Sequence, residues 1–239
     1  MTDKTERVVI TGITGGIAAA TARLLLQDGY EVVVSARDEA RLEKAVAELG
    51  AKAKGFVMDL TNPASVTNFF KAVGTFDHLV TPAATSMFAP IAEMDFEAAR
   101  QILETKQWGQ MLCVHEGAKR ISSTGSITLF SGTVTQKPLA GASMFAAVGG
   151  ATEAAARIWA FELAPVRVNT VVPGVIETPI WEALMPPEAA RATLDATAEV
   201  LPVGRVGRPE DVADGVRFLI ENGFVNGHAL VIDGGHRLV

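Results

Sequence analysis

The stretch VVITGITGGIAAATARLLL, residues 8–26, changes from an apolar strand pattern to an alanine-rich helix pattern across a turn that contains Gly12, Gly15 and Gly16. Glycine permits a tight turn and lets the backbone come close to a ligand, and small alanines let a helix pack closely on a sheet. The N–H groups at a helix N-terminus bind phosphates. The stretch therefore predicts the strand–turn–helix unit of a dinucleotide-binding fold. An ordinary glycine-bearing turn is the alternative.

Short β-branched runs alternate with helical patterns along the whole chain, which is typical of a parallel sheet covered by helices on both faces. We expect seven strands, within residues 7–12, 31–37, 54–60, 76–80, 125–132, 166–174 and 228–235. We expect helices at about 16–28, 38–48, 63–73, 95–120, 144–163 and 209–220. This predicts one α/β domain over residues 1–239, a doubly wound Rossmann fold. An insertion at about 175–208 would overhang the carboxyl ends of the strands, where ligands bind.

The composition favours a globular protein and limits its partners. Of 239 residues, 49% are hydrophobic and the net charge is −6, which argues against a nucleic-acid groove or an anionic membrane surface. No apolar run approaches the roughly 20 residues of a membrane span, and the polar start does not resemble a signal peptide, so we expect a cytoplasmic protein. Cys113 is the only cysteine and the four histidines are scattered, so we expect neither a disulfide nor a metal site.

The ends of the second and third strands carry polar side chains that suit a nucleotide. In VVVSARD, residues 32–38, Arg37 stands where NAD-binding folds usually carry an acidic residue for the ribose 2′-hydroxyl. An arginine there can bind a 2′-phosphate, which favours NADP(H) over NAD(H). The alternative is a solvated Arg37 paired with Asp38 or Glu39. Asp59, in VMDL, is a candidate acceptor for the adenine amino group, or a cap for the next helix.

Taken together, these residues resemble the short-chain dehydrogenase/reductase family over essentially the whole chain. The matching motifs are TGITGGIA at 11–18, MDL at 58–60, GSITLFSG at 125–132, FELAPVRVNTVVPG at 161–174, ETP at 177–179 and ALVIDGG at 229–235. The resemblance implies an NADP(H)-dependent oxidoreductase acting on a small-molecule substrate, with residues 179–200 as a substrate lid. It also implies a homotetramer or homodimer, built through the helices at 95–120 and 144–163 and the last strand, where large residues such as Trp159, Phe161 and Met111 suit an interface or the core.

The glycine turn, the strand ends and the resemblance together give a set of candidate cofactor residues. Those after the third to sixth strands follow from the resemblance, including the residues expected to line the nicotinamide pocket after the sixth strand. The set is Gly12, Thr14, Gly15, Gly16, Ile17, Ser35, Arg37, Asp59, Leu60, Ala83, Ala84, Lys106, Pro173, Gly174, Ile176 and Thr178.

The family's catalytic residues are not found at the matching positions. Its Tyr-x-x-x-Lys pair falls on Phe145 and Gly149, its serine falls on Gly132 with Ser131 one position earlier, and its helix asparagine falls on Lys106. Phenylalanine cannot donate or accept a proton, so the family's tyrosine mechanism is not available at that position.

Other positions depart from the family as well. The family's Asn-Asn-Ala-Gly reads Thr81-Pro82-Ala83-Ala84, and its third fingerprint glycine is Ala18. The chain's single tyrosine, Tyr30, precedes the second strand, which would put it at the end of the sheet opposite the cofactor, as a surface or core-edge residue.

Lys106 is the first candidate to replace the missing groups. It falls on the apolar stripe of the helix at 95–120, with Ala99, Ile102, Leu103 and Cys113. An unpaired ammonium there costs several kcal/mol unless it lines a wet or ligand-filled cavity. A solvated or snorkelling lysine is the alternative.

The absence of side chains at Gly149 and Gly132 would leave room for Lys106 to bind the nicotinamide ribose or relay a proton. Ser131 and Thr133 could hydrogen-bond a substrate oxygen, although a hydroxyl without a nearby base is a poor acid, and both could simply cap the strand end.

Two functions of different classes follow. The first is an NADP(H)-dependent oxidoreductase for a small carbonyl or alcohol, with protonation by water or by a Lys106-centred arrangement. The second is a redox-silent NADP(H)-binding protein, either a sensor or an inactive subunit. A cofactor-free lyase on the same scaffold is disfavoured by the glycine turn and Arg37.

Overall fold

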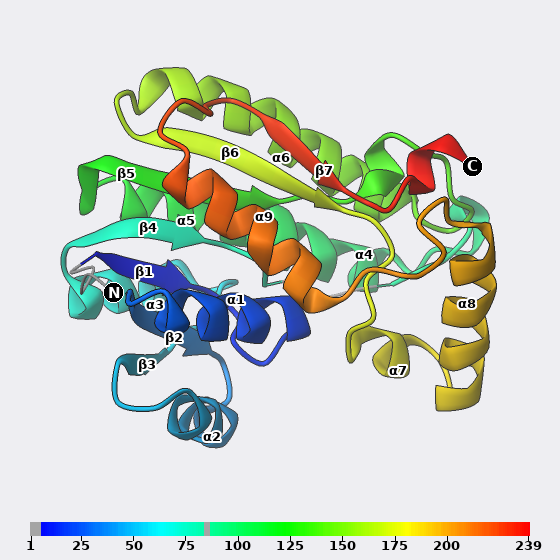
Figure 1. The fold of residues 1–239 in the computed structure, drawn as a ribbon, viewed down its shortest axis with the longest axis horizontal. Coiled ribbons are helices and arrows are strands. Elements are labelled where there is room, and N and C mark those ends of the chain that lie inside the picture. Colours follow the sequence, from blue (N-terminus) through cyan, green and yellow to red (C-terminus); the bar gives the residue numbers. More distant parts are fainter. Residues whose placement is uncertain (1–5, 84–86) are drawn as a thin grey trace.

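The computed structural model describes residues 6–83 and 87–239, and seven strands in it form one parallel sheet in the order β3-β2-β1-β4-β5-β6-β7 (Figure 1). The strands are β1 (Arg7–Ile10), β2 (Glu31–Ala36), β3 (Ala53–Val57), β4 (Phe76–Val80), β5 (Ile121–Phe130), β6 (Arg167–Pro173) and β7 (Ala229–Ile232). The predicted doubly wound Rossmann fold is confirmed.

Helices cover both faces of the sheet. One layer contains α1 (Gly16–Gln27), α2 (Glu39–Leu49) and α9 (Pro209–Glu221), and Figure 1 shows α1 and α9 crossing in front of the strands. The other layer contains α3 (Pro63–Val73), α4 (Phe96–Ile102), α5 (Gly109–Gly117) and α6 (Ser143–Glu162). Each layer buries its own cluster of aliphatic and aromatic side chains against the sheet, which accounts for the nearly continuous burial of the central strands.

Local signals in the sequence set where several helices begin. Asn62 caps α3, its Oδ1 accepting from the N–H groups of Ala64 at 3.0 Å and Ser65 at 3.2 Å, with Pro63 at the first helical position. Asp38 caps α2 in the same way, accepting from the N–H of Arg41 at 2.8 Å. The helix starts predicted at about residues 63 and 209 are therefore confirmed.

The helix expected at 95–120 is interrupted. A π-helical turn, Leu103–Trp108, separates α4 from α5. The extra residue per turn changes which side chains face the core, so Leu103, expected on the apolar stripe, is exposed, whereas Ala99, Ile102 and Cys113 are buried. Such turns are rare and often occur at functional sites.

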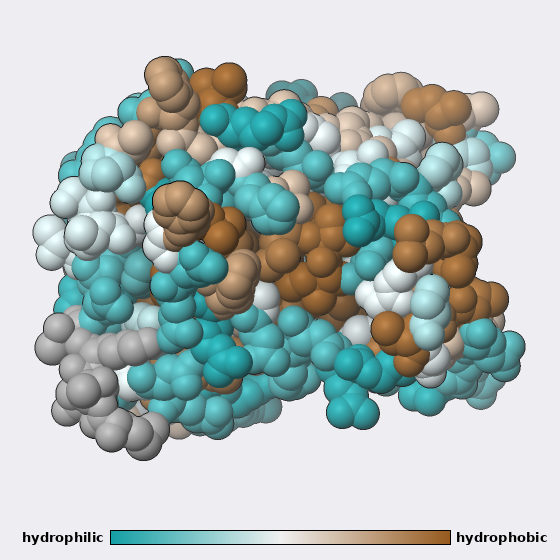
Figure 2. Space-filling view, turned by 45° about the horizontal axis from the view of Figure 1, so that its top comes forward, coloured by the Kyte–Doolittle hydropathy of each residue, from teal (hydrophilic) through white to brown (hydrophobic). Residues whose placement is uncertain are grey.

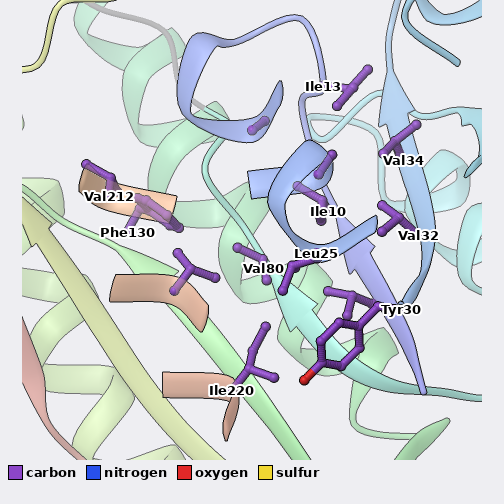
Figure 3. Packing of buried hydrophobic residues seen from close by; sticks show 14 of the residues in the cluster. Ile10, Ile13, Leu25, Tyr30, Val32, Val34, Val80, Phe130, Val212 and Ile220 are labelled. Carbon is purple, nitrogen blue, oxygen red and sulfur yellow. The ribbon is translucent and has the colours of Figure 1, made fainter. Parts of the chain in front are cut away.

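The larger apolar cluster lies between the sheet and the layer of α1 and α9, and includes Ile10, Val32, Phe130 and Val212 (Figure 3). Tyr30, expected at the surface or the edge of the core, is 1% exposed and belongs to this cluster. No helix in the described ranges is long and apolar enough to cross a membrane.

The order of the strands reverses beside β1. The chain runs outward from β1 to β3 and then returns to place β4 on the other side of β1. Ligands of such sheets bind outside the carboxyl ends of the strands at this reversal. The segment between β6 and α9 carries α7 (Ile180–Leu184) and α8 (Pro187–Val200), which lie beyond those carboxyl ends in Figure 1.

Candidate active site

Three segments converge at the carboxyl ends of β1, β4 and β6. Gly12 has φ +69°, and a Cβ placed there would lie 2.6 Å from Cβ of Ala83, in the segment after β4. A Cβ at Gly16 would lie 3.1 Å from Cγ2 of Thr178, which follows β6. Glycine is therefore required at position 12 by its close approach to Ala83 and by its backbone conformation, whereas a Cβ at position 16 would be tight against Thr178. The glycine turn predicted to bind a dinucleotide therefore contacts Ala83 and Thr178, which are themselves candidate cofactor residues.

The N-terminus of α1 fits a phosphate group. Gly15 caps the helix with no side-chain hydrogen bond, and the first turn, which the structure describes fully, carries no acidic residue. Thr14 and Gly15 are exposed, and Gly16 and Ile17 are partly exposed. Unpaired N–H groups and the positive end of the helix dipole are thus open to an anion.

Arg37 is positioned where a 2′-phosphate is expected. It is exposed after the end of β2 and makes no hydrogen bond or ion pair with any residue in the described part of the chain. Asp38 instead caps α2, so the alternative pairing with Asp38 or Glu39 is not observed. Ser35 is buried beneath the site, and its carbonyl accepts from the N–H of Ile13 at 2.9 Å.

Asp59 does not cap α3, because Asn62 does. Its Oδ1 accepts from the N–H of Thr61 at 2.9 Å and from the Thr61 hydroxyl at 2.8 Å, which holds the carboxylate in the turn after β3. The side chain remains partly exposed, as a contact with adenine requires. The neighbouring Leu60 is buried in the apolar cluster on the α3 and α5 side of the sheet.

The remaining candidates lie at the same edge. Pro173 ends β6, and Gly174 and Thr178 are partly exposed after it. Ile176 is buried in the larger apolar cluster. Ala84 lies outside the described residues. Within the ranges described, no group of three or more His, Cys, Asp or Glu side chains could hold a metal.

Lys106 is buried in the π-helical turn, with 8% of its surface exposed. Its Nζ donates to the carbonyl of Ser131 at 3.3 Å and lies 5.1 Å from the centre of the Phe145 ring, which in turn contacts Phe88. No carboxylate of the described residues lies within 4.0 Å of the ammonium, and its burial does not fit the alternative of a solvated or snorkelling lysine. Burial lowers the pKa of Lys106 to about 8.

Gln110 fixes the backbone around Lys106. Its Nε2 donates to the carbonyls of Lys106 at 2.8 Å and Phe130 at 3.1 Å, and its Oε1 accepts from the Phe130 N–H at 2.9 Å and the Thr81 hydroxyl at 2.8 Å. All the hydrogen-bonding capacity of this buried amide is used. The π-helical turn is therefore tied to the ends of β4 and β5.

The space beside Gly149 is filled, contrary to the expectation that Lys106 or a substrate would occupy it. A Cβ at Gly149 would lie 2.7 Å from Oγ of Ser131 and 2.8 Å from Cγ2 of Thr135. The Ser131 hydroxyl donates to Oε1 of Glu153 at 2.5 Å, and the Thr135 hydroxyl donates to the same oxygen at 2.8 Å. Ser131 therefore does have a base beside it, which sequence reasoning missed.

Other candidates from the sequence lie away from this cluster. Thr133 is buried and lies 3.4 Å from Nδ1 of His236 in the C-terminal turn. The ring of Tyr30 packs edge-on against His78, near the start of β4 and so at the edge opposite Lys106. The only tyrosine in the chain cannot act at this site.

Comparison with known proteins gives the family. The family model described as enoyl-(acyl carrier protein) reductase matches residues 12–237. Cis-4-hydroxycyclohexanecarboxylate dehydrogenase of Sinomonas cyclohexanicum is 34% identical, over 98% of both chains. The chain belongs to the short-chain dehydrogenase/reductase family.

Further short-chain dehydrogenase/reductase relatives agree. The 3-oxoacyl-[acyl-carrier-protein] reductase of Bos taurus is 31% identical, over 96% of this chain and 97% of its own. A crystal structure of a small-chain dehydrogenase in complex with NADPH superimposes with a TM-score of 0.86 at 30% identity, covering 99% of this chain and 100% of that chain. The resemblance inferred from the motifs is confirmed, and with it the Rossmann fold.

Proposed function

We propose that this short-chain dehydrogenase/reductase is an NADP(H)-dependent oxidoreductase that interconverts a small carbonyl compound and its alcohol. The open N-terminus of α1 and the unpaired Arg37 support NADP(H), and so does the likeness to a dehydrogenase solved with NADPH. The nicotinamide, when bound, supplies the two-electron chemistry. The residues that would hold it are those converging around Gly12, Gly16 and Thr178.

Lys106 is the residue on which the proposed catalytic chemistry depends. The family's tyrosine and lysine fall on Phe145 and Gly149, which provide neither a proton nor a charge. Lys106 places an unpaired ammonium at the same edge of the sheet, reached from the neighbouring helical turn. A buried cation stabilises negative charge that develops on a reacting oxygen, and it can also bind the hydroxyls of a ribose. We therefore assign to Lys106 the electrostatic part of catalysis.

The surroundings suggest an apolar substrate and a lid. Phe88 and Phe145 form an aromatic pair next to Lys106, with ring centres 5.2 Å apart. Figure 2 shows hydrophobic surface on the right of the view, the side on which α7 and α8 lie in Figure 1. These features support the segment at about 175–208 as a lid over a mainly apolar substrate.

Oligomer formation remains a prediction. Phe161, at the end of α6, is 86% exposed and so does not belong to the core, and all four residues of the edge strand β7 are partly exposed. Exposed apolar side chains on α6 and an unpaired edge at β7 support the predicted homodimer or homotetramer.

The first test is the Lys106→Met variant, assayed for NADPH oxidation with cyclohexanone, benzaldehyde and a naphthoquinone. We expect turnover to fall about 100-fold or more, the scale of a lost charged catalytic group. In the wild type, carbonyl reduction should decline as the pH rises through about 8, because the ammonium is then lost.

Lys71→Met is the matched control, because Lys71 is an exposed lysine on α3. It should retain wild-type turnover. Full activity of Lys106→Met, or a wild type that binds NADPH without oxidising it above the background of free cofactor, would contradict the proposal. The second result would favour the redox-silent binding protein.

A further inference from the structure

The hydroxyl of Ser131 is held by a carboxylate on α6. Its Oγ donates to Oε1 of Glu153 at 2.5 Å, and the hydroxyl of Thr135 donates to the same oxygen at 2.8 Å. Hydroxyl–carboxylate distances of about 2.5–2.7 Å are typical of charge-assisted hydrogen bonds. The Ser131 proton is therefore directed at Glu153, which leaves the lone pairs of Oγ to accept a proton from another donor.

Gly149 makes this contact possible. It lies one helical turn before Glu153, and a Cβ at this position would stand 2.7 Å from Oγ of Ser131. Any larger side chain would displace the hydroxyl from the face of α6. Gly149 stands where the family has its lysine, and the absence of a side chain there lets Ser131 reach Glu153.

Lys106 and Glu153 act on different atoms of the same residue. The ammonium of Lys106 donates to the carbonyl of Ser131, and Glu153 accepts from its side chain. Lys106 is buried, whereas Glu153 is partly exposed and can exchange protons with water. Lys106 is therefore suited to stabilise negative charge, and Glu153 is suited to exchange a proton.

We propose that Ser131 and Glu153 form the proton-transfer pair of this active site, with Ser131 exchanging a proton with the substrate oxygen and Glu153 exchanging one with Ser131. The inference rests on the proposed oxidoreductase function and extends it. Glu153 acts through Ser131, so it is a positioning residue rather than a group that touches substrate.

In the direction of alcohol oxidation, the substrate C–H bond would break and its hydrogen would leave with the electron pair, which bound oxidised nicotinamide would accept. The substrate O–H proton passes to Oγ of Ser131 as the proton of Ser131 passes to Oε1 of Glu153. The products are the carbonyl compound, the reduced cofactor and a neutral carboxylic acid at Glu153, which returns its proton to water. Reduction follows the same path in reverse.

Few other charged groups surround the pair in the described part of the chain. Lys106 lies behind the Ser131 peptide, and His236 contacts Thr133 at the far side of the turn that carries Thr135. Arg157, one turn further along α6, is exposed and makes no hydrogen bond or ion pair with another residue of the described ranges. The effect of replacing Glu153 can therefore be separated from the effect of replacing Lys106.

The test compares Glu153→Gln with Glu162→Gln, an exposed glutamate at the end of the same helix. Glutamine retains an oxygen that can accept from Ser131 and Thr135 but cannot take up a proton. For oxidation of cyclohexanol and benzyl alcohol, Glu153→Gln should lower kcat about 100-fold with little change in KM. Glu162→Gln should behave as the wild type.

Two further measurements separate proton transfer from a structural role. Glu153→Ala should regain activity as formate is added, because a small carboxylate can occupy the vacated position. In cofactor-free protein, the infrared carboxylate band that Glu153→Gln removes should shift in Ser131→Ala, which reports the hydrogen bond without any turnover.

These experiments separate failure of the proton-transfer pair from failure of the proposed oxidoreductase function. An active wild type whose Glu153→Gln variant retains the wild-type kcat, or whose Glu153→Ala variant is not rescued by formate, would overturn the proton-transfer pair and leave the oxidoreductase function intact. A wild type without turnover would overturn both, and the infrared shift would then report only a structural hydrogen bond.

Discussion

At the scale of single residues, Lys106 and Ser131 define the unusual character of this site. Lys106 is a buried cation whose partners are a carbonyl oxygen and an aromatic ring, neither of which carries a full charge. Such an arrangement costs stability, because desolvation of an ammonium is only partly offset by dipoles. Residues that destabilise the fold are often retained because they serve function.

This cost predicts how stability depends on pH. Burial lowers the pKa of Lys106 from 10.5 to about 8, so between these values the unfolded chain holds a proton that the folded chain has lost. Stability therefore rises with pH across this window, and the full penalty of about 3 kcal/mol is present below pH 8.

The Lys106→Met variant should accordingly be more stable than the wild type at pH 7, by about 1–3 kcal/mol after the loss of its hydrogen bond. Urea unfolding of both proteins between pH 7 and 10.5 checks this. The difference in unfolding free energy between the variant and the wild type should become smaller as the pH rises. A methionine variant that is less stable at pH 7, or a gap that does not change with pH, would show that the ammonium is not desolvated.

At the scale of elements, α6 and the π-helical turn place the candidate groups. Helix α6 carries Gly149 and Glu153 on the face that meets Ser131 and Thr135, and the π-helical turn directs Lys106 toward the end of β5. The two adjacent glycines of α6 differ in environment. Gly149 faces two side chains, whereas a Cβ at Gly150 would meet no atom within 4 Å.

Alanine at each glycine should therefore have a different effect. Gly150→Ala should stabilise the protein by up to about 1 kcal/mol through helix propensity, with no change in activity. Gly149→Ala should gain little or no stability, because the new Cβ turns the Ser131 hydroxyl away from Glu153, and it should lower the oxidation rate. Thermal unfolding and kcat of the two variants test this, and equal behaviour in both assays would count against the close packing at Gly149.

The elements were readable from the sequence because their signals are local. Asn62–Pro63 and Pro209 are typical of helix starts, and the glycine turn indicates the first strand–helix unit. The Ser131–Glu153 contact was not readable, because it joins residues 22 positions apart and depends on the conformation of the turn between them. The π-helical turn was also missed, since its extra residue leaves no distinct mark in an apolar pattern, yet it exposes Leu103 and buries Lys106.

At the scale of the whole molecule, the parallel sheet gathers these groups at one edge. Because all strands of the sheet are parallel, the glycine turn, Arg37, Lys106 and the segment of α7 and α8 lie at the same edge, although they are far apart in sequence. The opposite edge holds the only tyrosine, packed against His78. The fold thus preserves the nucleotide end of the short-chain dehydrogenase/reductase scaffold, while the groups proposed for chemistry come from different positions.

The most direct test is a fluorescence titration of the protein with NADPH and with NADH, followed by mixing of the bound reduced cofactor with the carbonyl panel. We predict that NADPH binds at least about tenfold more tightly than NADH, the scale of one charge-assisted hydrogen bond, and that Arg37→Ala removes the difference. We also predict that bound NADPH is oxidised by at least one carbonyl compound of the panel. A preference for NADH, or bound NADPH that stays reduced with every compound, would contradict the account.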